Sequence, residues 1–153
     1  MSDPLLLDPA KSLSRYPIGG KLTERHIIGT VPADAINTTW DGIEAEQKDV
    51  WLSYMMHEKV ATKHAADYDI CMRHKELCLE APTYIGFHPK HPGVVELIRR
   101  VPSRRAVVLV AVALVPNDSG NYSVASMYCV SEKRVEQYRD AGWLRPTKQK
   151  PRE

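Results

Sequence analysis

The sequence feature that most constrains the fold is an uninterrupted apolar run of ten residues at 106–115. A membrane-spanning helix needs about 20 apolar residues, and this run is shorter and rich in valine, so it is better suited to a β-strand. It lacks the alternation of apolar and polar residues that marks a strand with one wet face. We therefore expect both of its faces to be covered and the strand to lie at the centre of a sheet.

Two neighbouring segments extend this strand into a predicted antiparallel meander. Residues 94–101 are rich in β-branched side chains, and residues 122–130 return as a strand after the turn-forming segment 116–121. Strands joined by a loop rich in Gly, Asn and Asp are typical of a hairpin. A helix is predicted after the last strand, with Ser131 as its N-cap.

Further helices are predicted on the N-terminal side of the meander. A short strand at residues 49–52 precedes Ser53, a natural N-cap for a helix that runs to about His64. Asp67 is predicted to cap a second helix, which Pro82 ends. Helices and strands in separate blocks are typical of an α+β domain.

Alternation along the third strand sorts its side chains into two predicted sets. The set expected to face the core is Ala125, Met127 and Cys129, and the opposite set is Tyr122, Val124, Ser126 and Tyr128. On the first strand, Arg99 and Arg100 must point to opposite faces, so one arginine shares a face with the hydroxyl groups of the second set. A guanidinium group beside hydroxyl groups can bind phosphate, although the same side chains are also typical of a solvent-exposed sheet face.

Composition and charge fit one ordinary globular domain. The chain has 153 residues, 43% of them hydrophobic and 26% charged, which is enough to bury a core. Its net charge of +2 does not indicate a nucleic-acid partner, although basic residues outnumber acidic ones from Arg99 onward. An odd number of cysteines, three, argues for a reducing compartment. With no signal-peptide pattern and no apolar run of membrane-spanning length, we expect a cytoplasmic protein without a membrane partner.

The chain divides into three predicted parts. They are an N-terminal arm at residues 1–15, an α+β domain at residues 16–145 and a charged tail at residues 146–153.

The histidines are the natural proton-transfer groups at neutral pH. His64 follows Lys63 near the end of a predicted helix, so it is either a base beside a phosphate-binding cation or part of a solvated helix end. His88 and His91 lie in a proline-rich loop, where they either reach a substrate or are ordinary polar loop residues.

Metal binding is the alternative use of these side chains. His57, His64, Cys71 and Cys78 recur every seven residues, which aligns them only if one helix continues through all four. The short cysteine brackets of structural zinc sites are absent. We expect the two cysteines to be buried small hydrophobic residues, and we predict no metal and no cofactor.

Several short motifs follow one another in a recognisable order. They are Tyr16-Pro17-Ile18-Gly19, Val50-Trp51-Leu52-Ser53, Lys63-His64, Glu80-Ala81-Pro82, Arg99-Arg100, Ser126-Met127-Tyr128 and the helix start Val130-Ser131-Glu132-Lys133-Arg134-Val135. Their order and spacing across residues 16–144 resemble the phage-associated branch of the barnase–EndoU–colicin–RelE-like nucleases.

This resemblance implies a fold and an activity. The fold is α+β, with helices packed on one face of a four- or five-stranded antiparallel sheet, and the activity is metal-independent RNA cleavage, in the host cytoplasm if the chain is phage-encoded. The catalytic residues implied are Lys63, His64, Ser126 and Tyr128, and the substrate-binding residues are Arg99 or Arg100, His57 and Lys59. The chain departs from the family at His57, because the family's histidine before the Lys-His pair would fall near Lys59 or Val60.

Two functions follow as hypotheses. The first is a phage or toxin endoribonuclease that cleaves RNA by attack of the 2′-hydroxyl and leaves a 2′,3′-cyclic phosphate. The second is a non-catalytic phage-derived binding protein, or inhibitor of a host system, built on a nuclease-like fold. Either one can have a protein partner, such as an immunity protein or a host target. Convergence of His64, an arginine and Ser126 or Tyr128 in one site would favour the nuclease.

Overall fold

The structure is a computed structural model that describes residues 26–148. Its strands are β1 (His26–Thr30), β2 (Asp49–Leu52), β3 (Tyr84–Gly86), β4 (Val94–Val101), β5 (Ala106–Ala113), β6 (Tyr122–Cys129) and β7 (Leu144–Pro146). Its helices are α2 (Ala33–Thr39), α3 (Tyr54–Lys63), α4 (Tyr68–Glu80) and α5 (Glu132–Asp140), with short 3-10 turns η2 (Ala65–Asp67) and η3 (Pro102–Arg104). The predicted α+β class is confirmed.

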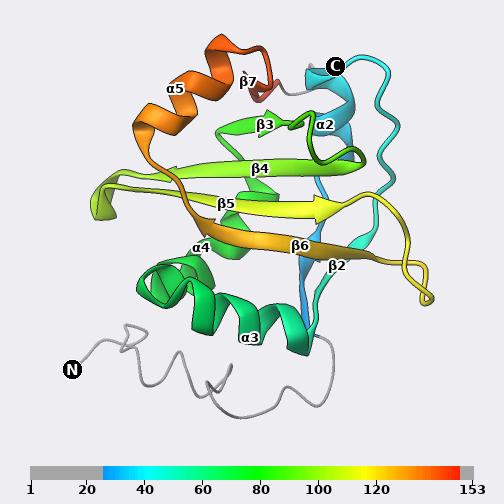
Figure 1. The fold of residues 1–153 in the computed structure, drawn as a ribbon. Helices are drawn as coiled ribbons and strands as arrows, with labels where there is room; N and C mark the ends of the chain where they lie inside the picture. The colour runs from blue at the N-terminus through cyan, green and yellow to red at the C-terminus, as the bar shows by residue number, and fades with distance from the viewer. Residues whose placement is uncertain (1–25, 149–153) are drawn as a thin grey trace.

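The apolar run forms β5 at the centre of the sheet. The strand order is β1-β2-β6-β5-β4-β3-β7, so three strands lie on each side of β5 (Figure 1). Every side chain from residue 107 to residue 112 is buried. The prediction of a central strand that is covered on both faces is therefore confirmed.

The sheet is larger than the four or five strands predicted. Among the described residues it has seven strands, because β1 and β7 extend its two edges. These edge strands are short and irregular in sequence, so their pairing with β2 and β3 depends on tertiary contacts that no local pattern reveals. The predicted N-terminal arm lies outside the described residues, and the boundary predicted for the tail falls within β7.

All neighbouring strands are antiparallel except β2 and β6. These two run parallel and are joined only at the pairs Val50–Tyr122 and Trp51–Ser123. Beyond Ser123, strand β6 therefore has β5 on one side and no strand of residues 26–148 on the other. This open edge lies above the C-terminal end of α3 in Figure 1.

Helices cover both faces of the sheet, whereas one covered face was predicted. The face that carries Val108 and Val110 packs against α3 and α4, and we call it the α4 face. The opposite face carries Leu109 and packs against Val135 of α5, and we call it the α5 face (Figure 1). The α5 helix has one buried residue, Val135, in a mostly charged sequence, which is why its packing was not predicted.

Two of the three predicted helix caps form as expected. The side chain of Ser53 accepts a hydrogen bond from Met56 N at 3.1 Å, and that of Ser131 accepts one from Arg134 N at 3.0 Å. Asp67 occupies the N-cap position of α4 without capping it. Its carboxylate instead accepts a hydrogen bond from the backbone N–H of Cys129 at 3.0 Å, which fixes the end of β6 against α4.

A β-bulge in β6 makes the predicted sorting of its side chains wrong. Between Val124 and Ser126 the register against β5 shifts, which leaves Ala125 as an extra residue. Tyr122 and Val124 are consequently buried on the α4 face, although alternation had placed them with Ser126 and Tyr128. The alternation rule fails here because it assumes a constant register along the strand.

The closeness of β3 to β7 gives the first testable prediction, which concerns Gly86. A Cβ atom at this position would lie 2.6 Å from Leu144 Cδ1 and 2.6 Å from the backbone oxygen of Trp143. Because backbone must move to relieve this overlap, we expect Gly86→Ala to lower the free energy of unfolding by about 1–3 kcal/mol in urea denaturation.

Gly42→Ala is the matched control for this substitution. Nothing lies within 4 Å of a Cβ atom there, and only the positive φ of 84° opposes the methyl group. Gly86→Ala should therefore cost more than Gly42→Ala. Equal costs would show that β7 does not pack tightly on β3.

Candidate functional site: a buried glutamate on the α5 face

Two neighbouring rows of paired residues cross strands β4, β5 and β6 on the α5 face. The rows are Glu96–Ala111–Ser126 and Ile98–Leu109–Tyr128. Because directly paired residues lie on the same face of a sheet, Glu96 shares the α5 face with the hydroxyl groups of Ser126 and Tyr128. Strand β5 separates the glutamate from these hydroxyls, so their backbones lie about 10 Å apart.

Glu96 is a carboxylic acid in the middle of an apolar strand. The residue is only 6% exposed, and no hydrogen bond or ion pair joins its side chain to another described residue. Burial raises the pKa of this carboxyl above its ordinary value, and the charge of His91 opposes that effect to a smaller degree. Partial removal of a carboxyl group from water without a hydrogen-bonding partner is costly, and ionisable groups with shifted pKa values concentrate at functional sites.

The loop between β3 and β4 brings two histidines to this site. The ring centroid of His88 lies 4.5 Å from that of Trp143, 5.4 Å from that of Tyr138 and 5.5 Å from that of His91. Burial, together with nearby positive charges, lowers the pKa of His88, which favours its neutral form. His91 is exposed and near enough to Glu96 to affect its ionisation.

Helix α5 adds a cation and a phenol. Arg134 Nη1 donates a hydrogen bond to Tyr138 Oη at 3.4 Å, and the guanidinium carbon lies 5.8 Å from the centroid of the same ring. Val135, the next residue, is buried against the sheet and holds the helix on the α5 face. Arg134 itself is exposed, which leaves its guanidinium open to an anionic ligand.

Tyr128 connects the two sides of the site. Burial raises its pKa, and the charges of Glu96 and Tyr138 raise it further, while Arg134 lowers it. The phenol is therefore a hydrogen-bond donor at neutral pH. On the open edge of β6, its ring stacks on that of His64, with centroids 5.3 Å apart and planes 24° from parallel.

These contacts define one constellation, which we call the Glu96 cluster. Its members are Glu96, His88, His91, Tyr128, Arg134 and Tyr138. It combines a proton-transfer group, a cation and hydroxyl donors, which are the parts that acid–base chemistry on a phosphodiester requires.

The structure brings three of the predicted site residues to this cluster. His64 stacks on Tyr128, and Ser126 lies on the same face one row away. Arg100 also lies on the α5 face, but it is committed to Glu132, with Arg100 Nη2 2.8 Å from Glu132 Oε1. Arg134 is thus the exposed arginine of the cluster, while Arg100 is paired with Glu132.

The other predicted residues lie elsewhere. Arg99 points to the opposite face, where its Nη1 donates to the carbonyl oxygen of Ala81 at 2.7 Å and caps the end of α4. His57 is completely buried and its Nε2 lies 2.7 Å from Tyr68 Oη, so it does not fit a substrate-binding role. Lys59 and Lys63 are exposed on α3.

Three residues of the cluster were missed in the sequence. Arg134 and Tyr138 belong to a helix whose packing face was not recognised, so nothing placed them near the meander. Glu96 carried a usable signal, because it is the one acidic residue in the strand at residues 94–101 and it lies between apolar neighbours. A charge at a position that must be buried is itself a sign of function.

Metal ligation is not supported by the geometry. Across residues 26–148, no group of three or more His, Cys, Asp or Glu side chains is arranged to hold a metal ion. The heptad of histidines and cysteines is interrupted by η2. Cys71 and Cys78 are buried, as predicted, and neither is in a disulfide.

Comparisons with known proteins give no independent identification. No family model, curated protein or solved structure matches the chain. None of the helices in the described part of the chain has both the length and the apolar character needed to cross a bilayer.

Proposed function

We propose that this protein is a metal-independent endoribonuclease whose active site is the Glu96 cluster together with His64. The observation that carries the proposal is the buried Glu96 carboxyl, which shares a sheet face with Tyr128 and lies under the α5 helix that carries Arg134. The order of motifs that resembles the phage-associated nucleases is a second, independent support.

The chemistry needs no group beyond those in the site. RNA carries its own nucleophile, the 2′-hydroxyl. A base removes its proton while the 2′-oxygen attacks phosphorus, and the bond from phosphorus to the 5′-oxygen breaks as an acid protonates that oxygen. Glu96 is the base and His64 the acid in this proposal. Arg134, Tyr128 and Ser126 donate to the phosphate oxygens, where negative charge increases in the transition state.

The same carboxyl favours an enzyme over a passive binding protein. A negative charge near a bound phosphate weakens binding, and burying a carboxyl without a partner costs stability. A glutamine at position 96 would avoid the charge in a module that only binds RNA. A glutamate is suited to accept and release a proton there.

Incubation of the purified protein with single-stranded RNA in EDTA tests the proposal. We expect cleavage with 2′,3′-cyclic phosphate ends, because the attacking group is the RNA's own hydroxyl, and we expect DNA of the same sequence to remain intact. Mass spectrometry of the products identifies the ends. Cleavage of DNA, a strict requirement for divalent metal, or binding of RNA without any cleavage would contradict the proposal.

A further inference from the structure

The hairpin between β4 and β5 carries a concentration of arginines that the Glu96 cluster does not use. Four arginines fall within seven residues at the end of this hairpin: Arg99, Arg100, Arg104 and Arg105. The first two are engaged, one with the Ala81 carbonyl and the other with Glu132. The last two are exposed.

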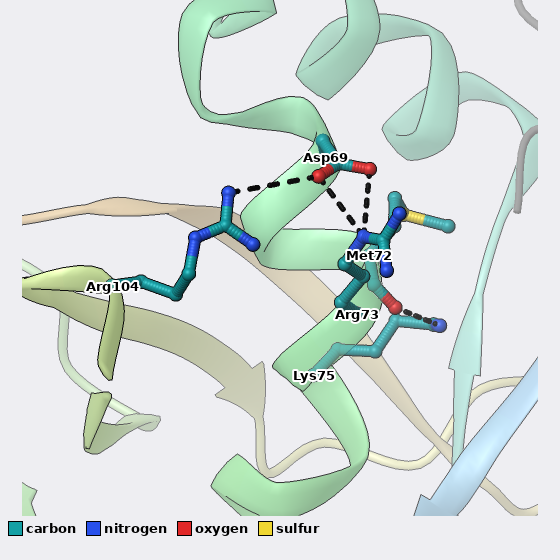
Figure 2. Close-up of polar contacts among 5 residues, drawn as sticks. All are labelled: Asp69, Met72, Arg73, Lys75 and Arg104. Atoms are coloured by element: carbon teal, nitrogen blue, oxygen red, sulfur yellow. Dashed lines mark hydrogen bonds and ion pairs between the residues drawn. The ribbon is translucent and has the colours of Figure 1, made fainter. Parts of the chain in front are cut away.

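Arg104 lies near the carboxylate of Asp69 but makes no hydrogen bond with it. Its Nη2 lies 4.0 Å from Asp69 Oδ2, which is too far for a hydrogen bond. Both oxygens of Asp69 already accept from Arg73 Nε at 3.0 Å, as Figure 2 shows. One carboxylate therefore faces two guanidinium groups, and the donors of Arg104 make no hydrogen bond to any described residue.

Arg105 occupies a backbone conformation that an arginine rarely adopts. Its φ is 51° and its ψ is 42°, and it is the one described residue other than glycine with a positive φ. Glycine or asparagine would be less strained at this position of the turn. A side chain kept in such a conformation at an exposed turn is a sign that the side chain itself is used.

The pKa of His74, on the neighbouring helix α4, is also affected by nearby arginines. Burial lowers its pKa most, and Arg104 and Arg73 lower it further, while Asp69 opposes them. Arg104 and Arg73 thus place positive charge beside His74 of α4. Exposed guanidinium groups such as those of Arg104 and Arg105 attract phosphate.

We propose that Arg104 and Arg105 form a second contact site for the phosphodiester backbone of RNA, separate from the Glu96 cluster. This proposal rests on the proposed function, because the proposed function places the scissile phosphate of the RNA at Glu96. Pro102 directly follows β4 and is six residues from Glu96, or about 20 Å along the extended strand. An RNA strand whose scissile phosphate lies at Glu96 reaches the tip of the β4–β5 hairpin only if it extends several nucleotides beyond that phosphate.

Binding of 2′-O-methyl RNA tests this site without cleavage, because the nucleophile is blocked. The variant is Arg104→Gln/Arg105→Gly, in which glycine also relieves the positive φ, so the melting temperature should not fall. For an oligonucleotide of about 12 residues, each phosphate contact contributes about 0.7 to the slope of log affinity against log salt. We expect the variant to reduce that slope by about 1.4, and a dinucleotide to bind it as it binds the wild type.

Lys48→Gln/Lys148→Gln is the control with the same change in net charge. Lys48 is paired with Glu46, and the backbone N–H of Lys148 donates to Thr39 of α2, so neither residue belongs to the β4–β5 hairpin. The control should keep the wild-type slope. The proposal is wrong if the hairpin variant keeps the wild-type slope or if the control loses as much of the slope. It is also wrong if dinucleotide binding falls as much as oligonucleotide binding, or if the hairpin binds an acidic protein in preference to RNA.

Failure of this site and failure of the proposed function give different results. If the protein binds the long oligonucleotide through the hairpin but never cleaves RNA, the second site is supported and the proposed function is wrong. If the protein cleaves RNA while the hairpin variant keeps its full slope, the proposed function is supported and the second site is wrong.

Discussion

Glu96→Gln is expected to abolish RNA cleavage while leaving the fold intact. The substitution keeps the shape of the side chain and removes its ability to accept a proton. Loss of one positioned acid or base typically costs about 10²–10⁴-fold in rate. Initial rates on a fluorogenic RNA oligonucleotide measure the loss, and circular dichroism checks the fold.

The same variant should be at least as stable as the wild type at pH 7. The pKa of Glu96 in the folded state is raised above its ordinary value of 4.5. The stability that the protonated carboxyl contributes is therefore fully present below pH 4.5, and it is lost as the pH rises through the folded pKa. Glutamine is neutral throughout, so its melting temperature should be higher than that of the wild type at pH 7, and the difference should shrink in acid.

The pairing of lost activity with retained or increased stability distinguishes a catalytic carboxyl from a structural one. Glu44→Gln, at an exposed loop residue, is the matched control and should change neither property. If Glu96→Gln cleaves RNA at the wild-type rate, the base is another group. If it unfolds the protein, the carboxyl has a structural partner.

The centre of the fold was predictable and its edges were not. The ten apolar residues at 106–115, rich in valine and without alternation, favoured a strand covered on both faces, and β5 is such a strand. Strand β7 has three residues and pairs with β3 after a helix, so its place depends on contacts between segments far apart in sequence. The bulge at Ala125 is likewise a property of the paired strands, because neither strand shows it alone.

The sequence predicted only those parts of the candidate site that lie on strands β4 and β6 and at the end of helix α3. Alternation predicted that one of Arg99 and Arg100 shares a face with Ser126 and Tyr128, and the register shows that it is Arg100. The motif order indicated His64, which stacks on Tyr128. What alternation did not show is that Arg100 is occupied by Glu132. The charges that complete the site come from α5 and from the loop after β3, and only the tertiary packing brings them to Glu96.

His64→Ala is the second substitution with a large expected effect. If His64 donates the proton to the leaving 5′-oxygen, its loss should lower the cleavage rate by about 10²–10⁴-fold. Glu96→Gln should remove the acidic limb of the pH–rate profile, because that limb follows protonation of the base. The residual rate of Glu96→Gln across pH measures this limb, and the rate of His64→Ala at neutral pH measures the loss of the acid.

His64→Phe separates proton transfer from packing. Phenylalanine keeps an aromatic ring at the position where His64 stacks on Tyr128, with centroids 5.3 Å apart, but it carries no proton to donate. If proton transfer is the role of His64, both variants lose activity equally. If the ring only positions Tyr128, His64→Phe retains cleavage where His64→Ala does not. Full cleavage by both would assign the acid to the exposed His91, because its charge also acts on Glu96 from the loop after β3.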